Sequence, residues 1–185
     1  MSLVLASSSP RRKKLLAEGG FTFEIEKPDY DERHLRLSPA EIYTMQLALQ
    51  KAMSVKEKRP EDVVVAVDTV VVLDDAILGK PKDRAEAEKM LLTMKGRTHR
   101  VISAYDILGD EKYVDYDQSF VHFEDFTEAQ MKAYLDKNTY MDKAGAYGVQ
   151  DIDEFKITVE GAMDTVIGMH VASIEKQLKG VGHER

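Results

Sequence analysis

The chain has 185 residues and a formal net charge of −7, and this length suits one unit with a hydrophobic core. It contains no cysteine, which excludes disulfides, thiolate metal sites and a thiol nucleophile. The acidic balance argues against broad nucleic-acid binding, which needs a positive field. No apolar run reaches the roughly 20 residues that span a bilayer, and the N-terminus lacks a signal-peptide layout, so we expect a cytoplasmic protein with no membrane or nucleic-acid partner.

The first predicted elements are a strand, a helix and a second strand. Residues 2–6, SLVLA, are typical of a short buried strand, and Ser9 followed by Pro10 fits the N-cap and first position of a helix. Residues 21–27 alternate apolar and polar side chains, which predicts a half-buried strand.

A long helix and a central strand are predicted next. Ser38 and Glu41 form a capping box that opens a helix over residues 38–54. Residues 62–74 are β-branched and nearly all apolar, as in a strand that is covered on both faces. The apolar positions of the helix fall on one face, which is expected to be buried: Ile42, Met45, Leu49 and Met53.

The second half of the chain mixes helices and strands. Asp83 fits the N-cap of a helix with an apolar stripe from Ala87 to Met94, and Gly96 suits its C-terminus. Such a mixture predicts an α/β fold with helices flanking one long mixed sheet. The remaining predicted elements are a hairpin of residues 100–107 and 112–123 around Gly109, a helix over 128–137 opened by a capping box of Thr127 and Gln130, strands near 156–159 and 165–169, and a helix over 171–179 that ends at Gly180.

The segment SSSPRR, residues 7–12, is suited to binding an anion. A helix N-terminus presents N–H groups that lack intrahelical partners, and the helix dipole adds roughly half a positive charge there. Arg11 and Arg12 in the first turn are unfavourable for the helix alone, but arginine binds phosphate oxygens in bidentate fashion. A phosphate site and a solvated basic patch both fit this segment, and Lys13 and Lys14 are expected to face solvent.

Asp68 lies inside the apolar strand VVVAVDTVVVL. A buried carboxylate is unfavourable unless it is paired, hydrogen-bonded or bound to a metal. A functional acid is favoured over a structural acid tied to an arginine or to backbone N–H groups, because perturbed acids concentrate at active sites. Thr69, the next residue, should point to the opposite face of a regular strand.

Two further segments carry charges that have both functional and structural interpretations. Asp29, Asp31 and Glu32 form an acidic loop that fits either Mg²⁺ binding or a solvated turn. Lys80 lies in a Gly-Lys-Pro turn after the central strand, where it either meets phosphate or is exposed. Lys51 lies near the end of its helix, where cations are favourable, and needs no function by itself.

The segment DKAGAYGVQ, residues 142–150, is rich in glycine. Gly145 permits a tight turn or a close approach of a ligand to the backbone. Tyr147 and Gln150 either address a planar base or belong to a plain loop with a packed tyrosine. His99 has no metal-ligand spacing to another histidine, so it is expected to be structural.

Six segments, taken in order, resemble the Maf family of nucleoside triphosphate pyrophosphatases. They are LASSSPRR near the N-terminus, QKA at 50–52, AVDTVVVLD at 66–74, LGKPKD at 78–83, GRTHRVIS at 96–103 and MDKAGAYGVQ at 141–150. The resemblance implies one Maf-like domain over residues 1–185, a two-lobed α/β unit with a cleft between the lobes, similar in outline to the inosine triphosphate pyrophosphatases. The family often dimerises, so a homodimer is also expected.

The resemblance also implies a reaction. The family hydrolyses a nucleoside triphosphate to the monophosphate and pyrophosphate with a divalent metal cation, Mg²⁺ or Mn²⁺. By motif, Asp68 matches the proton acceptor or a metal ligand beside Glu32. The run AGAYGVQ resembles the branch that acts on dTTP and UTP rather than the branch that acts on 7-methyl-GTP. Ser7, Arg12, Lys51 and Lys80 match positions that bind phosphate, and Arg11, Thr69 and Gln150 match positions that influence substrate choice.

Three positions depart from the family pattern beside the expected base-binding end: Asp151, Met163 and His170. They leave open which pyrimidine, or modified base, is preferred. Two alternatives also remain open. One is a non-catalytic module that senses nucleotides or regulates septum formation, and the other is the branch that acts on 7-methyl-GTP.

Overall fold

A computed structural model describes residues 1–30, 39–181 and 183 of the chain. These residues form two compact units: the first contains Met1–Thr69, Ser103–Asp117 and Gly168–Arg185, and the second contains Val70–Ile102 and Gln118–Ile167. The strands follow the order β2-β1-β3-β5-β6-β7, with β4 beside β3, and β3 (Val63–Leu73), β5 (Thr98–Leu108) and β6 (Lys112–Phe123) contribute residues to both units. Within the described part of the chain, no helix is long and apolar enough to cross a membrane.

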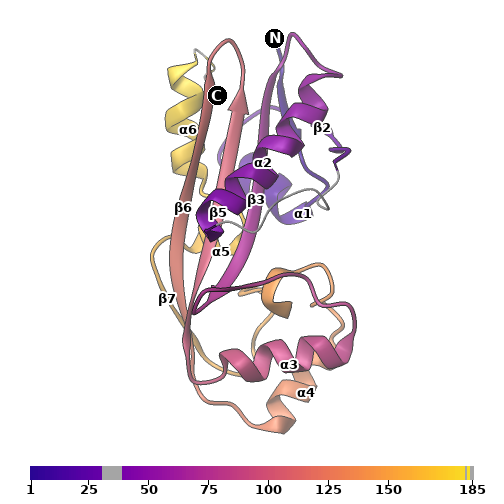
Figure 1. Ribbon diagram of the computed structural model, residues 1–185, viewed down its shortest axis with the longest axis vertical. Helices are drawn as coiled ribbons and strands as arrows, with labels where there is room; N and C mark the ends of the chain where they lie inside the picture. Colours follow the sequence, from indigo (N-terminus) through magenta and orange to yellow (C-terminus); the bar gives the residue numbers. More distant parts are fainter. Residues whose placement is uncertain (31–38, 182, 184–185) are drawn as a thin grey trace. The chain divides into compact units, whose positions relative to one another are not determined.

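The first unit is built on parallel strands. Strand β1 (Leu3–Ala6) pairs in parallel with β2 (Glu24–Glu26) and with β3. Its helices are α1 (Pro10–Glu18), α2 (Ala40–Lys56) and α6 (Val171–Gly180), and Figure 1 shows α6 beside β6.

The side chains of β3 alternate between two buried faces of the sheet in this unit. Val65 and Val67 pack in one cluster with Leu16 of α1 and with Ile174 of α6. Val64 and Ala66 of β3 pack in another cluster with Ala52 and Val55 of α2. Because successive strand residues point to opposite faces, Asp68 faces the α2 side and Thr69 faces the side of α1 and α6.

The second unit contains the antiparallel pairs of the sheet. Strand β4 (Ala76–Leu78) pairs antiparallel with β3, and β7 (Ile157–Glu160) pairs antiparallel with β6. The sheet is therefore mixed, as predicted. Helices α3 (Arg84–Met94) and α4 (Glu128–Asp136) lie side by side over one apolar core (Figure 1). A 3₁₀ turn (Ala144–Ala146) and the short helix α5 (Met163–Ile167) complete the unit.

Local sequence signals predicted many of these elements. Asp83 caps α3 by accepting a hydrogen bond from the Glu86 amide at 2.8 Å, and Gly96 adopts a φ of 65° just after this helix. Thr127 and Gln130 form the predicted capping box of α4. The hairpin of β5 and β6 and the final helix α6 also lie where they were predicted.

The strand predicted near residues 165–169 is wrong, because the chain forms the helix α5 there. Thr165 and the two residues after it are β-branched, which favours a strand on local grounds. The Asp164 side chain instead accepts a hydrogen bond from the Thr165 amide at 2.9 Å, as at a helix N-terminus. Gly168 then ends the helix with a φ of 134°.

The predictions for α2 need two corrections. The N-cap residue is Pro39, without a side-chain capping bond, and Ser38 lies outside the described residues. The predicted apolar stripe is not the buried face, since Ile42 is 45% exposed and Met53 is 48% exposed. Small side chains such as Ala48 and Ala52 contact the core instead, so two stripes were available and periodicity alone did not distinguish them. Likewise, the strand predicted over 21–27 is limited to β2, which is mostly exposed.

Asp106 of β5 is a buried carboxylate that lacks hydrogen-bond partners within the described residues. Its side chain has no solvent exposure, and neither carboxylate oxygen has a hydrogen-bond partner among the described residues. Burial raises the pKa of Asp106 to about 6, and the positive charge of Lys112 opposes this shift. The ionised form of Asp106 therefore destabilises the folded state above about pH 6.

Replacement Asp106→Asn is predicted to raise the free energy of unfolding at pH 8 by about 2–3 kcal/mol. Because the folded-state pKa lies above the unfolded one, the wild type gains stability as the pH falls from about 6 to about 4. The variant lacks this gain, so the difference should vanish near pH 4. Burial lowers the pKa of His99 to about 4, so this residue lowers stability as the pH falls. The effect is the same in the wild type and in Asp106→Asn, so it cancels in their difference. Urea unfolding at several pH values measures the difference, and a difference that stays constant with pH would contradict the prediction.

Candidate active site

Helix α1 begins just after β1, and its first turn has no side-chain cap. Ser9 occupies the N-cap position, but its side chain makes no capping hydrogen bond. Ser7 is buried, and its Oγ accepts a hydrogen bond from the Ser9 amide at 3.1 Å. The end of α1 therefore keeps the partial positive charge of a helix N-terminus next to Arg11 and Arg12. Lys13 and Lys14 are exposed, as predicted.

The Arg12 side chain is fixed by two groups from distant parts of the first unit. Its Nε donates to the Gly168 carbonyl oxygen at 3.0 Å, and its Nη2 donates to Thr69 Oγ1 at 3.0 Å. Desolvation lowers the pKa of Arg12, and the negative charge of Asp68 opposes this effect. An arginine stays charged despite such a shift, so the unit holds a fixed cation close to a carboxylate.

Lys51 and Asp68 form a buried ion pair on the other face of β3. Lys51 is 7% exposed and Asp68 is 8% exposed, and the Lys51 ammonium donates to Asp68 Oδ1. The ammonium also lies 5.0 Å from the ring centroid of Tyr30, within the range of a cation–π interaction. Lys51 is therefore buried and paired with an acid, whereas its sequence position alone indicated only a favourable cation near a helix end.

The first unit thus brings together six predicted site residues. They are Ser7, Arg11, Arg12, Lys51, Asp68 and Thr69, which all belong to residues 1–69. Glu32, the predicted second metal ligand, lies outside the described residues. Sequence reasoning missed Tyr30, Ser103 and the Gly168 carbonyl, although a serine inside the apolar run VISAYDIL was a usable signal.

The other two predicted site residues belong to the second unit. Lys80 and Gln150 are both exposed there. The Gly145 amide donates to the Gly79 carbonyl oxygen at 3.0 Å, which joins the Lys80 turn to the loop that carries Gln150. Gly145 has a φ of 67°, and an added Cβ would lie 3.1 Å from the Val71 side chain, so this junction needs glycine.

The predicted divalent metal cation requires oxygen ligands near Asp68. Mg²⁺ prefers carboxylate oxygens and usually keeps several waters, so one or two carboxylates suffice. Asp68 supplies such oxygens in a partly enclosed position, and Glu32 would be the second ligand by resemblance. No cluster of three or more acidic or histidine ligands occurs among the residues that the structure describes. The ligand type of Asp68 therefore fits a hard divalent cation such as Mg²⁺ or Mn²⁺.

Tyr147 packs in the core of the second unit, which favours the packed tyrosine over the contact with a planar base. It is 5% exposed, and its hydroxyl lies 2.6 Å from Nε2 of the buried His99. Both rings make edge-to-face contacts with Phe123. Burial raises the pKa of Tyr147 and lowers the pKa of His99 to about 4, so both groups are neutral at pH 7. His99 is structural, as predicted.

Replacement Tyr147→Phe is predicted to lower the free energy of unfolding by about 1–3 kcal/mol, because it leaves a buried imidazole nitrogen without its partner. His99 Nδ1 already lacks a partner within the described residues. Ratios of activity among nucleotides should stay within twofold, since the tyrosine is remote from solvent. Chemical denaturation and a nucleotide panel check both parts, and a changed nucleotide preference would restore Tyr147 as a base contact.

The three departures from the family pattern have distinct surroundings. Asp151 Oδ2 lies 3.1 Å from the ammonium of the buried Lys143, so the extra acid is paired inside the second unit. Met163 is exposed at the start of α5. In the first unit, His170 Nδ1 lies 2.8 Å from Ser173 Oγ and 3.1 Å from Asp117 Oδ1, at the start of α6.

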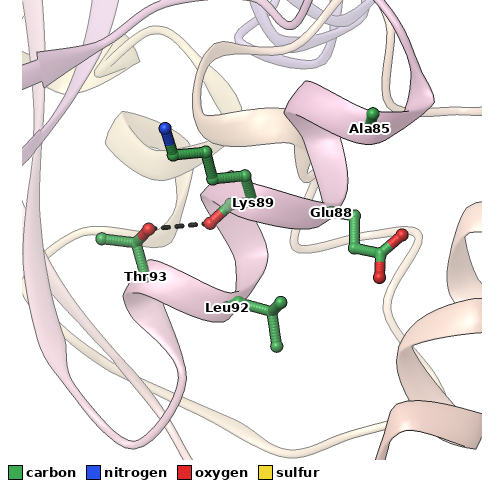
Figure 2. Close-up of a pocket in the computed structure, with 5 residues that line it drawn as sticks. All are labelled: Ala85, Glu88, Lys89, Leu92 and Thr93. Carbon is green, nitrogen blue, oxygen red and sulfur yellow. Dashed lines mark hydrogen bonds between the residues drawn. The ribbon is translucent and has the colours of Figure 1, made fainter.

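An open hollow on the outer face of α3 does not resemble this site. Figure 2 shows its five lining residues, which all come from one helix: Ala85, Glu88, Lys89, Leu92 and Thr93. The Thr93 hydroxyl donates back to the Lys89 carbonyl oxygen at 2.7 Å, as is common within helices. None of the predicted site residues lines this hollow.

The first unit thus places a hydrogen-bonded arginine, an uncapped helix N-terminus and a buried lysine–carboxylate pair within one α/β fold, an arrangement whose positive groups suit an anionic ligand. The family model of the Maf-like protein matches residues 2–181. The chain therefore belongs to the Maf family.

Curated relatives cover nearly the whole chain. The dTTP/UTP pyrophosphatase of Clostridioides difficile is 40% identical over 183 residues, covering 97% of this chain and 94% of the relative. The dTTP/UTP pyrophosphatase of Symbiobacterium thermophilum is 39% identical, covering 98% and 94%. That of Shewanella denitrificans is 40% identical, covering 91% and 90%.

Solved structures resemble the chain more distantly. One is a nucleoside-triphosphatase, or dITP/XTP pyrophosphatase, from Mycobacterium abscessus, with a TM-score of 0.43 and 18% identity over 66% of this chain and 74% of that chain. Another is a HAM1 protein from Coxiella burnetii, with a TM-score of 0.46 and 12% identity over 97% of this chain and 96% of that chain.

Proposed function

We propose that this protein hydrolyses dTTP and UTP to the monophosphate and pyrophosphate, with other or modified pyrimidine nucleotides as further substrates. The observation that carries the proposal is the buried Lys51–Asp68 pair together with the fixed Arg12 guanidinium, which interacts electrostatically with Asp68. Three relatives that act on dTTP and UTP by name, at 39–40% identity, support the choice of substrate. A triphosphate supplies the anion for which these cations and the end of α1 are suited.

Asp68 is proposed as the proton acceptor. The Lys51 ammonium donates a hydrogen bond to Oδ1 of Asp68. The second oxygen, Oδ2, is then proposed to accept a proton from water. The water oxygen bonds to the α-phosphorus, the bond from this phosphorus to the bridging oxygen breaks, and pyrophosphate leaves. The ion pair with Lys51 fixes the orientation of the carboxylate, which a general base needs for efficient proton transfer.

The cations are proposed to lower the repulsion between a triphosphate and an approaching nucleophile. Arg12 presents a planar fork beside the N-terminus of α1, and Lys51 places a second charge across β3. Ser7 supplies a hydroxyl at the loop that leads into α1. Lys80 as a phosphate contact, and Arg11 and Gln150 as substrate-choice residues, remain predictions from the family resemblance.

Divalent metal is proposed as a cofactor, held by Asp68 and Glu32. When bound, Mg²⁺ or Mn²⁺ would neutralise phosphate charge and favour ionisation of a bound water. Removing the metal with EDTA should abolish pyrophosphate release, and excess Mg²⁺ should restore it. Full activity in EDTA would overturn this part of the proposal.

A panel of nucleoside triphosphates with Mg²⁺ or Mn²⁺, read by pyrophosphate release, tests the proposed function. The expected result is release of pyrophosphate from dTTP and UTP, at rates above those for purine nucleotides. Release of orthophosphate alone would exclude the reaction, and saturable binding without turnover would favour the nucleotide-sensing alternative. A preference for 7-methyl-GTP would assign the chain to the other branch. A homodimer and a cytoplasmic location also remain proposals, which light scattering and cell fractionation test.

A further inference from the structure

Ser103 is a buried hydroxyl that the proposed mechanism does not use. It is 1% exposed in β5, and its Oγ lies 3.1 Å from Thr69 Oγ1. Among the described residues, Thr69 is its hydrogen-bond partner. The hydroxyl proton of Ser103 therefore goes to Thr69, because the opposite direction would bury that proton without an acceptor, at a cost of about 1–3 kcal/mol.

This direction fixes every other hydrogen bond of Thr69. Its oxygen accepts from Ser103 and from Arg12 Nη2 at 3.0 Å, so its own proton is donated to the Gly168 carbonyl oxygen at 3.2 Å. The same carbonyl oxygen accepts from Arg12 Nε at 3.0 Å. A hydroxyl offers one donor and two acceptor sites, and Thr69 uses all three.

We infer that Ser103 is a positioning residue, which holds the Arg12 guanidinium in place for the triphosphate through Thr69 and the Gly168 carbonyl. The inference rests on the proposed function. It also means that the Thr69 hydroxyl has no hydrogen-bonding capacity left for a nucleotide base, so Thr69 affects substrate choice through the position of Arg12. Ser103 and Gly168 thereby join the residues on which phosphate binding depends.

The test compares the KM for dTTP of the wild type, Ser103→Ala, Thr69→Val and the double variant. Loss of one neutral hydrogen bond should raise the KM of Ser103→Ala about fivefold with a smaller change in kcat, because Arg12 binds phosphate before and during the reaction. In the Thr69→Val background, Ser103→Ala should change KM by less than twofold, because the relay, the chain of hydrogen bonds from Ser103 through Thr69 to Arg12, is already broken. Equal effects in both backgrounds, or an unchanged KM in Ser103→Ala, would overturn the inference.

Two controls separate positioning from a loss of stability. Thr44→Val removes another buried hydroxyl of the first unit, whose bond to the Ala40 carbonyl stays within its own helix. It should leave KM unchanged, and a rise equal to that of Ser103→Ala would refute a specific role. Ser103→Thr and Ser103→Val differ by the hydroxyl alone, and Thr should retain the lower KM. This pair also serves if Ser103→Ala does not fold.

A separate measurement distinguishes this inference from the proposed function. If the wild type releases no pyrophosphate from any nucleotide, the function fails. Binding of inorganic tripolyphosphate by calorimetry then tests the relay alone. If Ser103→Ala weakens tripolyphosphate binding in the wild type but has no further effect in the Thr69→Val background, the positioning role is still supported. Unchanged binding in Ser103→Ala would exclude it.

Discussion

Replacement Asp68→Asn should reduce kcat for pyrophosphate release by about 10²- to 10⁴-fold while nucleotide binding persists. Asparagine is nearly isosteric and its side-chain oxygen can still accept from Lys51, so the packing around this buried residue should survive. It cannot take a proton from water. In the absence of divalent metal, loss of a negative charge near the triphosphate should leave the dissociation constant of the nucleotide unchanged or lower it. Steady-state kinetics with dTTP and calorimetry of nucleotide binding measure the two effects.

The matched control for this change is Asp106→Asn. It makes the same substitution at another buried carboxylate of the first unit, which takes no part in the proposed mechanism. It should retain kcat within about twofold, since its only expected effect is on stability. Residual activity of Asp68→Asn above a tenth of the wild type, in a protein with native circular dichroism, would remove Asp68 from the role of proton acceptor.

The parts of the fold that the sequence predicted are those with strong local signals. The capping residues Asp83 and Thr127 set helix starts through bonds to neighbours three residues away, so no tertiary information was required. The failures occurred where tertiary contacts decided the outcome. The β-branched residues of α5 have strand propensity, and α2 offered two apolar stripes of which the one rich in alanine packs inward.

The site was predictable as a set of residue types and not as a set of contacts. An acid in an apolar strand required a partner, but nothing local identified Lys51, which lies 17 residues away on another element. The Gly168 carbonyl is 156 residues from Arg12, and a backbone oxygen carries no signal in the side-chain sequence. The role of Tyr147 stayed open because an aromatic residue between glycines fits both a ligand contact and a core contact, and its burial decides between them.

Replacement Arg12→Lys should raise the KM for dTTP by about 10- to 100-fold although the formal charge is kept. Lysine is a point charge without the planar fork, so it cannot reproduce both the Nε bond to Gly168 and the Nη2 bond to Thr69. Loss of hydrogen bonds from a charged group typically costs about 1.5–3 kcal/mol, which corresponds to this range of KM. The ammonium would also lose its fixed position relative to Asp68, so kcat should fall as well, by a smaller factor.

The control for Arg12→Lys lies on the same helix. Lys14 is exposed, and its contact with Glu18 is a surface ion pair at 3.8 Å, so Lys14→Ala removes a nearby positive charge from the same basic run without touching the hydrogen bonds of Arg12. It should change KM by less than twofold at 0.15 M salt, because exposed charges are screened over about 8 Å. If both variants raised the KM for dTTP equally, the basic segment would attract the triphosphate through its summed positive charge. An effect confined to Arg12→Lys would show that the fixed geometry of the guanidinium, and not the charge of the segment, binds the triphosphate.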